Sequence, residues 1–375
     1  MNNWILRLEG WKPEEHAHRE ALCTLGNGIF ATRGAAEEVP ENKYNYPGTY
    51  LAGAYNRARS KIAGRDIENE DLVNWPNWLY LTFKHQDGQW FDLEDTEVLE
   101  YIQELNIKEG SLLRKMKFRD KDGRITSLIS HRVVSMNNPH EAAVKWVLIP
   151  ENWTGNITVR SAIDGRVRNY GVKRYRDLES QHISVKEKGI TRDHFLYLSA
   201  RSLQSEMLVS MASGTRIYKD DSEIRGERKS VVRENFTAED INIECGKLYP
   251  VTIEKTFTMY SSKDFAISDP LTEALSHIKR IEGFNEVKDK NRNEWAEIWK
   301  KNDILIENKD GKKDHQMILR LHIFHLYQTV SRNSIGYDTG VPSRGWHGEA
   351  YRGHIFWDEL YIFPFINLHE PQLAR

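Results

Sequence analysis

Residues 142–163 read AAVKWVLIPENWTGNITVRSAI, and this stretch holds the pattern that decides the fold. Every second residue from Ala142 to Leu148 is apolar, and a similar alternation returns from Ile157 to Ile163. A repeat of two residues predicts β-strands that bury one face and turn the other toward solvent. The stretch therefore predicts strands rather than helices.

The same pattern extends over residues 75–262. Further strands are predicted at residues 78–83, 195–200, 207–211 and 251–259. Turn signals separate the strands at Asp87–Gly88, Asp122–Gly123, Asn137–Pro139, Asp164–Gly165 and Ser213–Gly214. Because no helical run intervenes, the region predicts a large antiparallel β-sandwich rather than alternating strands and helices. Upstream, Leu25–Gly28 predicts a strand that is interrupted by a tight turn.

After Ser262 the period changes to that of helices. Ser268–Pro270 predicts a helix start, and a second helix is predicted over 287–300. A charged loop at 309–313 leads to a third helix, capped by Asp314 and apolar nearly all round, which is typical of a buried helix. The chain thus predicts a sandwich over 1–262, a helical linker over 263–312 and a helical region over 313–375.

Composition narrows the function classes. The 375 residues carry a formal net charge of −2, which disfavours a nucleic-acid partner. No apolar stretch resembles a signal peptide or reaches the ~20 residues of a membrane span. Cys23 and Cys245 form neither a metal motif nor a disulfide framework, so we expect free thiols in a reducing cytoplasm; a single bridge stays open. His322 and His325 have the spacing of a metal pair, but no nearby ligand completes a site, so no metal is expected.

Residues 340–365, GVPSRGWHGEAYRGHIFWDELYIFPF, are the densest polar and aromatic stretch. Glycines predict a loop in the first half, and the pattern from Ile355 onward predicts a helix. An indole such as Trp357 can stack on a sugar ring, and a carboxylate such as Asp358 can accept hydrogen bonds from vicinal hydroxyls. An equal alternative is that Trp357 and Phe356 are core residues and Asp358 caps a helix or pairs with Arg352.

The stretch does not contain a convincing acid/base pair. Asp358 and Glu359 are adjacent and diverge by about 100° on a helix, while inverting glycosidases place two carboxylates about 6.5–9.5 Å apart. Glu349 with Asp358 is an unsupported pairing. The most basic window, RVRNYGVKRYR at 166–176, is interpreted as a solvated strand face or exposed loop in preference to a nucleic-acid patch.

The segment GEAYRGHIFWDELYIFPF at 348–365 resembles the signature of glycoside hydrolase family 65. The resemblance continues upstream in LGNGIFATRG at 25–34, NEWAEIWKKNDILIE at 293–307 and HIFHLYQTV at 322–330. It implies a galactose mutarotase-like β-sandwich, a helical linker and the beginning of an incomplete (α/α)6 barrel. The family contains maltose, trehalose and kojibiose phosphorylases and some acid trehalases.

The resemblance also implies a site. The family's tryptophan–aspartate pair, which binds the non-reducing glucosyl unit, corresponds to Trp357 and Asp358. The expected substrate-binding set is Trp357, Asp358, Arg352, His354, Tyr351, Phe356 and Glu349. The family's general acid and phosphate-binding residues fall beyond Arg375, so we expect no catalytic residue within this chain and no turnover by it alone. Glu359–Leu360 replaces the commoner Thr-Glu after the aspartate, so the resemblance does not fix the disaccharide.

For the intact protein the resemblance implies inverting phosphorolysis of an α-glucosidic disaccharide to β-glucose 1-phosphate and a free sugar. Inorganic phosphate would be the co-substrate, and no cofactor is expected. The alternatives are a trehalase-like hydrolase of the same family and a non-catalytic, carbohydrate-binding or interaction fragment. As partners we expect a small α-glucosyl disaccharide, no nucleic acid and no membrane; a homodimer is left open.

Overall fold

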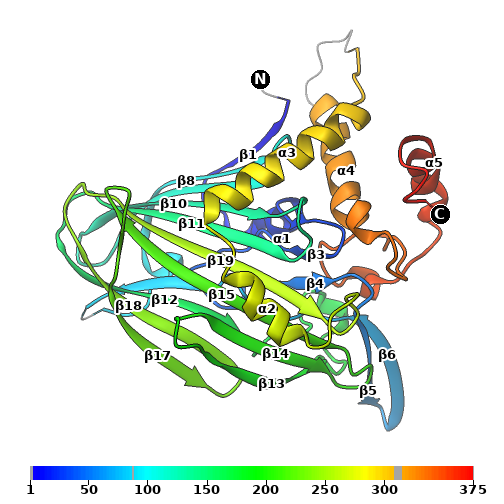
Figure 1. Cartoon of the computed structure of the whole chain (residues 1–375), viewed down its shortest axis with the longest axis horizontal. Coiled ribbons are helices and arrows are strands. Elements are labelled where there is room, and N and C mark those ends of the chain that lie inside the picture. The colour runs from blue at the N-terminus through cyan, green and yellow to red at the C-terminus, as the bar shows by residue number, and fades with distance from the viewer. Residues whose placement is uncertain (1–2, 87, 308–314, 375) are drawn as a thin grey trace.

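The computed structural model describes residues 3–86, 88–307 and 315–374. It is a mostly antiparallel β-sandwich followed by helices, as predicted (Figure 1). Asp87 of one predicted turn, the charged loop at 309–313, the cap residue Asp314 and the terminal Arg375 lie outside the described residues.

The larger sheet is antiparallel and follows the spatial order β1-β8-β9-β10-β11-β19-β15-β14-β13, with β16 paired to β15. Its strands are β1 (Ile5–Glu9), β8 (Glu97–Asn106), β9 (Ser111–Arg119), β10 (Ile125–Val134), β11 (Glu141–Pro150), β13 (Ile183–Ile190), β14 (Leu196–Ser202), β15 (Leu208–Lys219), β16 (Ser222–Ile224) and β19 (Val251–Ser261). The second sheet has the order β17-β18-β12-β7. Its strands are β17 (Glu227–Arg233), β18 (Phe236–Cys245), β12 (Gly155–Asp164) and β7 (Leu81–His85).

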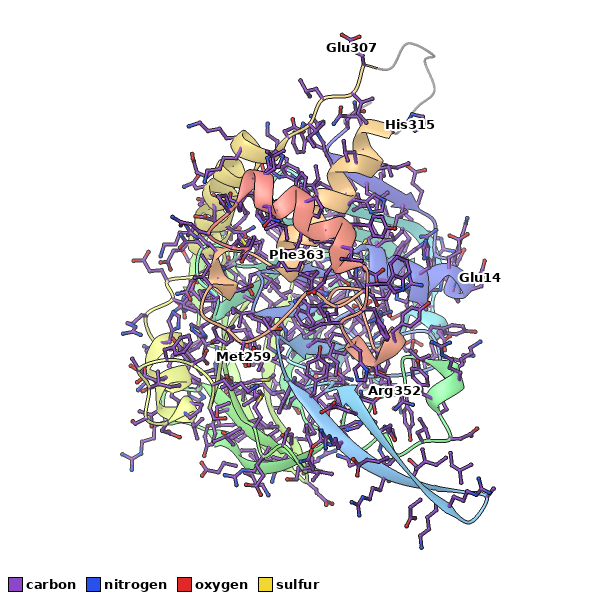
Figure 2. The ribbon with its side chains drawn as sticks, turned by 90° about the vertical axis from the view of Figure 1, so that its right-hand side faces the viewer. Glu14, Met259, Glu307, His315, Arg352 and Phe363 are labelled. Carbon is purple, nitrogen blue, oxygen red and sulfur yellow. The ribbon has the colours of Figure 1, made fainter. Side chains whose placement is uncertain are left out.

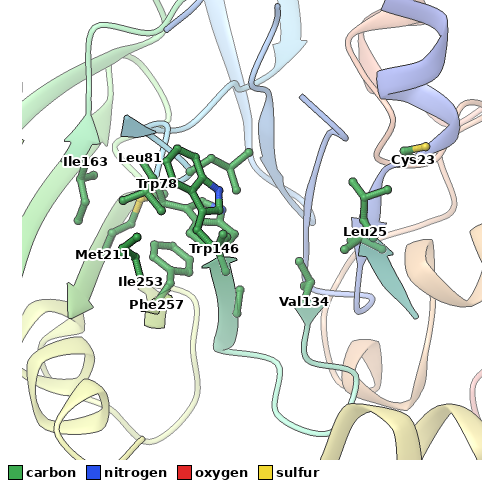
Figure 3. Packing of buried hydrophobic residues seen from close by; sticks show 14 of the residues in the cluster. Cys23, Leu25, Trp78, Leu81, Val134, Trp146, Ile163, Met211, Ile253 and Phe257 are labelled. Carbon is green, nitrogen blue, oxygen red and sulfur yellow. The ribbon is translucent and has the colours of Figure 1, made fainter. Parts of the chain in front are cut away.

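The core lies between these sheets (Figure 3). Trp78 stacks on Phe257 of β19 with ring centroids 4.4 Å apart, and Trp146 of β11 is fully buried beside them. Lys255 of β19 crosses the core and donates to the carbonyl of Ala162 on β12 at 2.6 Å. Burial lowers the pKa of the Lys255 amine well below its usual value. The apolar side chains of the alternating stretch Ile157–Ile163 point into this core, as the pattern predicts.

Two small sheets build the side of the sandwich that faces the helices. The first joins β2 (Leu25–Gly26), β3 (Phe30–Thr32) and β4 (Thr49–Leu51), and Gly28 makes the predicted turn with φ +90°. The second is a two-stranded hairpin of β5 (Tyr55–Ile62) and β6 (Arg65–Leu72), which projects from the body (Figures 1 and 2).

The helices are α1 (Pro13–Leu22), α2 (Pro270–Ile278), α3 (Phe284–Asn302), α4 (His315–Thr329) and α5 (Glu359–His369). The predicted start of α2 is confirmed, because the Asp269 carboxylate caps the helix by accepting from the Thr272 amide at 2.7 Å. Helix α2 packs on β15 and β19, while α3 contacts β10 and β11, which are central strands of the larger sheet. No helix in the described ranges is long and apolar enough to cross a membrane.

Three local predictions are wrong or incomplete. Ser213–Gly214, predicted as a turn, lies inside β15, where the Phe195 ring covers the glycine so closely that a Cβ would come within 2.9 Å. The helix predicted from Ile355 begins only at Glu359. Helix α1 escaped detection because its buried face is polar and so shows no apolar period.

Gly110 offers a test of how α3 is held on the sandwich. It lies between β8 and β9 with φ +62°, and a Cβ there would come within 2.0 Å of Trp295 Nε1 on α3. Gly123, between β9 and β10, has φ +81° and nothing within 4 Å of its Cβ position. Both Gly→Ala changes cost about 1–2 kcal/mol of backbone strain, but Gly110→Ala should lose about 1–3 kcal/mol more through overpacking.

The measurement is the free energy of unfolding from denaturant titration of the two variants and the parent protein. Equal losses for Gly110→Ala and Gly123→Ala would show that Trp295 does not pack against this turn.

Candidate functional site

The 340–358 loop is anchored to the body at its first turn by a buried tryptophan. Trp346 is 1% exposed, and its indole N–H donates to the carbonyl of Thr329, the last residue of α4, at 2.9 Å. His347 follows it, and one of its ring nitrogens lies 2.9 Å from the carbonyl of Ala21 on α1. The His347 ring also packs 4.2 Å from His325 of α4, and burial lowers the pKa of His347 to about 4. These residues hold the loop against α1 and α4.

Glu349 is the deepest polar group of the loop, with only 4% exposure. Its carboxylate accepts hydrogen bonds from the hydroxyl of Tyr46, the hydroxyl of Tyr50 at 3.1 Å and the amide of Gly171 at 3.0 Å. Burial raises the pKa of Glu349 to about 7, against the opposing effect of the Tyr46, Gly171 and Tyr50 hydrogen bonds and of the Arg33 charge. One carboxylate thus connects the 340–358 loop to β4, to Tyr46 just before that strand, and to the segment that contains Gly171.

Arg33 extends this network into α1. Its guanidinium donates to the carbonyl of His347, to the carbonyl of Tyr46 at 3.2 Å and to the Glu20 carboxylate at 3.0 Å. Glu20 is fully buried, and burial raises its pKa to about 7. A chain of buried polar groups therefore runs from α1 to the loop and fixes the backbone on either side of Gly348.

The β5–β6 hairpin supports the next part of the loop, the short 3-10 turn η4 (Ala350–Gly353). The Tyr55 hydroxyl donates to the Gly353 carbonyl at 2.5 Å, and the Gly353 Cα packs so tightly on Leu72 that a Cβ would come within 2.5 Å. His354 lies 2.9 Å from the carbonyl of Glu70 through Nε2, and Arg352 lies 3.7 Å from the carboxylate of Asp71. Figure 2 labels Arg352 near the base of the hairpin.

Beyond these anchors the side chains face outward. Tyr351 is 46% exposed and Phe356 45%, with ring centroids 5.8 Å apart. Trp357 is 68% exposed and meets Tyr361, four residues later, at 5.8 Å. Asp358 occupies the N-cap position of α5, yet its carboxylate does not cap the helix. The indole and the carboxylate are therefore both available to a ligand.

This geometry separates the two interpretations left open by the sequence. Trp357 and Phe356 are not core residues, and Asp358 neither caps α5 nor forms an ion pair with Arg352 in the described part of the chain. The other carboxylates are engaged: Glu349 is buried as described, and Glu359 accepts from the amide of Val341 at 2.9 Å. Sugar binding by the seven predicted residues stays a prediction.

The structure assigns these seven residues different tasks. Tyr351, Phe356 and Trp357 are exposed, and Asp358 beside them is half-buried. Arg352 and His354 contact the hairpin, and Glu349 is buried and anchors the loop. Sequence reasoning missed the partners from the sandwich, which are Tyr46, Tyr50, Tyr55, Asp71 and the 166–176 segment. The tyrosines of residues 45–55, NYPGTYLAGAY, were the available signal.

Glu349 also generates a pH prediction. Its folded pKa of about 7 lies above the ordinary value of 4.5, so between these values the folded protein binds a proton that the unfolded chain lacks. The stability contributed by the protonated group is complete below about pH 4.5 and is lost as the pH rises through about 7. The stability of Glu349→Gln relative to the parent should therefore increase from pH 5 to pH 8.

The measurement is the difference in free energy of unfolding between the two proteins at several pH values. Because Glu20 is present in both, its own titration cancels in that difference. A difference that is constant across the range, or that narrows with rising pH, would contradict the assignment.

Comparisons with known proteins match this chain over nearly its whole length. The family model "Glycosyl hydrolase family 65, N-terminal domain" matches residues 6–298, and "Glycosyl hydrolase family 65 central catalytic domain" matches residues 320–375. An uncharacterized glycosyl hydrolase of Mycobacterium tuberculosis is 36% identical over 99% of this chain and 28% of its own length. Trehalose 6-phosphate phosphorylase of Lactococcus lactis is 30% identical over 100% of this chain and 46% of its own length.

A solved structure of a candidate kojibiose phosphorylase from the human microbiome has the same fold. It superposes with a TM-score of 0.83 at 18% identity, over 99% of this chain and 47% of that one. The chain therefore spans about half the length, or less, of these relatives.

Proposed function

Because the chain belongs to glycosyl hydrolase family 65, we propose that the intact protein cleaves an α-glucosidic disaccharide by inverting phosphorolysis. The products would be β-glucose 1-phosphate and a free sugar. The observation that carries the proposal is the exposed indole of Trp357 beside the half-buried Asp358, whose carboxylate does not cap α5, with the preceding loop anchored at the buried Glu349. This chain supplies glucosyl recognition, and helices α4 and α5 begin the barrel that completes the site.

Trp357 and Asp358 suit a glucosyl unit for separate reasons. The indole gives a flat apolar surface for the C–H face of the ring, and its 68% exposure leaves that surface open. The Asp358 carboxylate can accept hydrogen bonds from two neighbouring hydroxyls, each worth about 1.5–3 kcal/mol for a charged acceptor. Together they fix the sugar with its anomeric carbon in one orientation.

The proposed reaction needs one acid and a phosphate ion. The acid protonates the glycosidic oxygen while a phosphate oxygen attacks C1 from the opposite face, so the C1–O bond to the leaving sugar breaks as the C1–O bond to phosphate forms. Phosphate takes the place of the activated water, so no second catalytic carboxylate is required. The resemblance to family 65 implies that this acid lies outside the residues of this chain, and the engagement of both Glu349 and Glu359 supports that part of the proposal.

Two further features support related parts of the proposal. The apolar residues Leu360, Tyr361 and Leu368 of α5 are 74–78% exposed, which fits a helix that packs against further barrel helices.

Cys23 and Cys245 are both buried, unpaired thiols, which fits a reducing cytoplasmic location.

The identity of the nucleophile can be tested by leaving out phosphate. The intact protein should release sugar from an α-glucosyl disaccharide such as trehalose or kojibiose only when inorganic phosphate is present, and it should form β-glucose 1-phosphate in equal amount. Both products are measured with and without phosphate. Equal release in the two conditions would identify a hydrolase of the same family instead.

A further prediction concerns recognition. Asp358→Ala in the intact protein should lower kcat/KM by about 10²–10⁴-fold, because two charged hydrogen bonds to the sugar are lost. Asp289→Ala, which removes a 52% exposed aspartate from α3, is the matched control and should leave kcat/KM within about twofold. Unchanged kinetics for Asp358→Ala would make Asp358 a structural residue.

A further inference from the structure

The basic 166–176 segment, which the proposed reaction does not use, lies against the glucosyl-recognition loop. It follows β12 and carries the 3-10 turn η2 (Lys173–Tyr175). It is fixed at two points: the backbone amide of Gly171 donates to the Glu349 carboxylate at 3.0 Å, and the side-chain amide of Asn169 donates to the Leu72 carbonyl at 2.7 Å. The segment is therefore attached to both the loop and the hairpin, and it is not a freely solvated strand face.

Three guanidinium groups meet around two tyrosine rings at this junction. The Arg174 Cζ lies 4.9 Å from the ring centroid of Tyr175 and 5.6 Å from that of Tyr351. Arg344 lies 5.8 Å from the Tyr351 ring, and Arg352 lies 4.8 Å from the Tyr175 ring. Stacking on the rings orients cations that come from the sandwich and from the loop.

The positive charge of this cluster is poorly balanced. Arg352 faces the Asp71 carboxylate at 3.7 Å, which is beyond a good hydrogen bond. Arg174 donates to the Tyr175 hydroxyl at 2.9 Å, and neither Arg174 nor Arg344 forms an ion pair with any residue in the described ranges. Like charges held together repel, and a bound anion would relieve that repulsion. Arginine forks match phosphate oxygens in particular.

The cluster adjoins the proposed glucosyl site. Tyr351, which carries two of the arginines, also contacts Phe356, and Phe356 immediately precedes Trp357 and Asp358. A sugar bound at Trp357 would therefore present its neighbouring sugar, or the attacking phosphate, toward the arginines. Inversion requires the nucleophile and the leaving sugar to lie on opposite faces of C1. The arginine cluster therefore cannot bind both the attacking phosphate and the leaving sugar in a single turnover.

We propose that Arg174, Arg344 and Arg352 form an anion subsite for a phosphoryl group carried by the leaving sugar. The preferred substrate is then a phosphorylated α-glucosyl disaccharide, and the 166–176 segment is its specificity element. This inference rests on the proposed phosphorolysis and adds the class of acceptor.

The test uses the intact protein in the reverse direction, with β-glucose 1-phosphate as donor and either glucose 6-phosphate or glucose as acceptor. The kcat/KM for glucose 6-phosphate should exceed that for glucose by at least 100-fold. Arg174→Gln and Arg344→Gln should each lower this ratio at least tenfold, as expected when a charge-assisted hydrogen bond is lost. Arg192→Gln, at an exposed arginine of the turn between β13 and β14, should leave the ratio unchanged.

Calorimetry without turnover gives a second readout. Glucose 6-phosphate should bind the parent protein at least tenfold more tightly than inorganic phosphate alone, and Arg174→Gln should abolish that preference. A ratio near one in the reverse reaction, unaffected by the arginine variants, would overturn the subsite while leaving phosphorolysis intact. An effect of the variants on the KM of inorganic phosphate in the forward reaction, with no change in acceptor preference, would overturn it as well. Absence of any phosphate-dependent reaction with either acceptor would instead refute the proposed function.

Discussion

The site depends on a single buried carboxylate. Glu349 is removed from water and must have its oxygens hydrogen-bonded, because an unpaired buried charge is among the costliest groups a protein can hold. Its donors are Tyr46, which precedes β4, Tyr50 within β4, and Gly171 of the 166–176 segment. The hydrogen bonds that the Glu349 carboxylate requires therefore bring together segments that are distant in the sequence and that no local secondary-structure preference would place side by side.

The anchor and the exposed residues divide the loop into two layers. Below, Trp346, His347 and Glu349 bind the backbone to α1, α4 and the sandwich. Above, the Trp357 indole is 68% exposed and meets only the edge-on ring of Tyr361 among the described residues, and the half-buried Asp358 carboxylate does not cap α5. A binding surface gains precision when its supports are rigid, because the ligand then orders few groups on arrival. The β-sandwich serves here as the rigid support for the 340–358 loop.

Much of the fold could be predicted from the sequence, since strand alternation such as that of Ile157–Ile163 is a local property. The family resemblance is also confirmed, because its motifs are contiguous in the chain. The placement of Arg174 and Tyr175 beside Arg352 could not be predicted, because it depends on contacts between residues 178 positions apart. Helix α1 was missed for a related reason, as its buried face is polar and the partners of Glu20, Arg33 and the Tyr46 amide, lie outside the helix.

The separation between Tyr46 and Glu349, 303 positions, also has a consequence for synthesis. At about 5–20 residues per second, a ribosome needs roughly 15–60 s to make that length, and domains fold as they emerge. The sandwich therefore has time to fold before the 340–358 loop leaves the ribosome. Tyr46 and Tyr50 would then already occupy their folded positions, and the loop would fold against a surface that is complete.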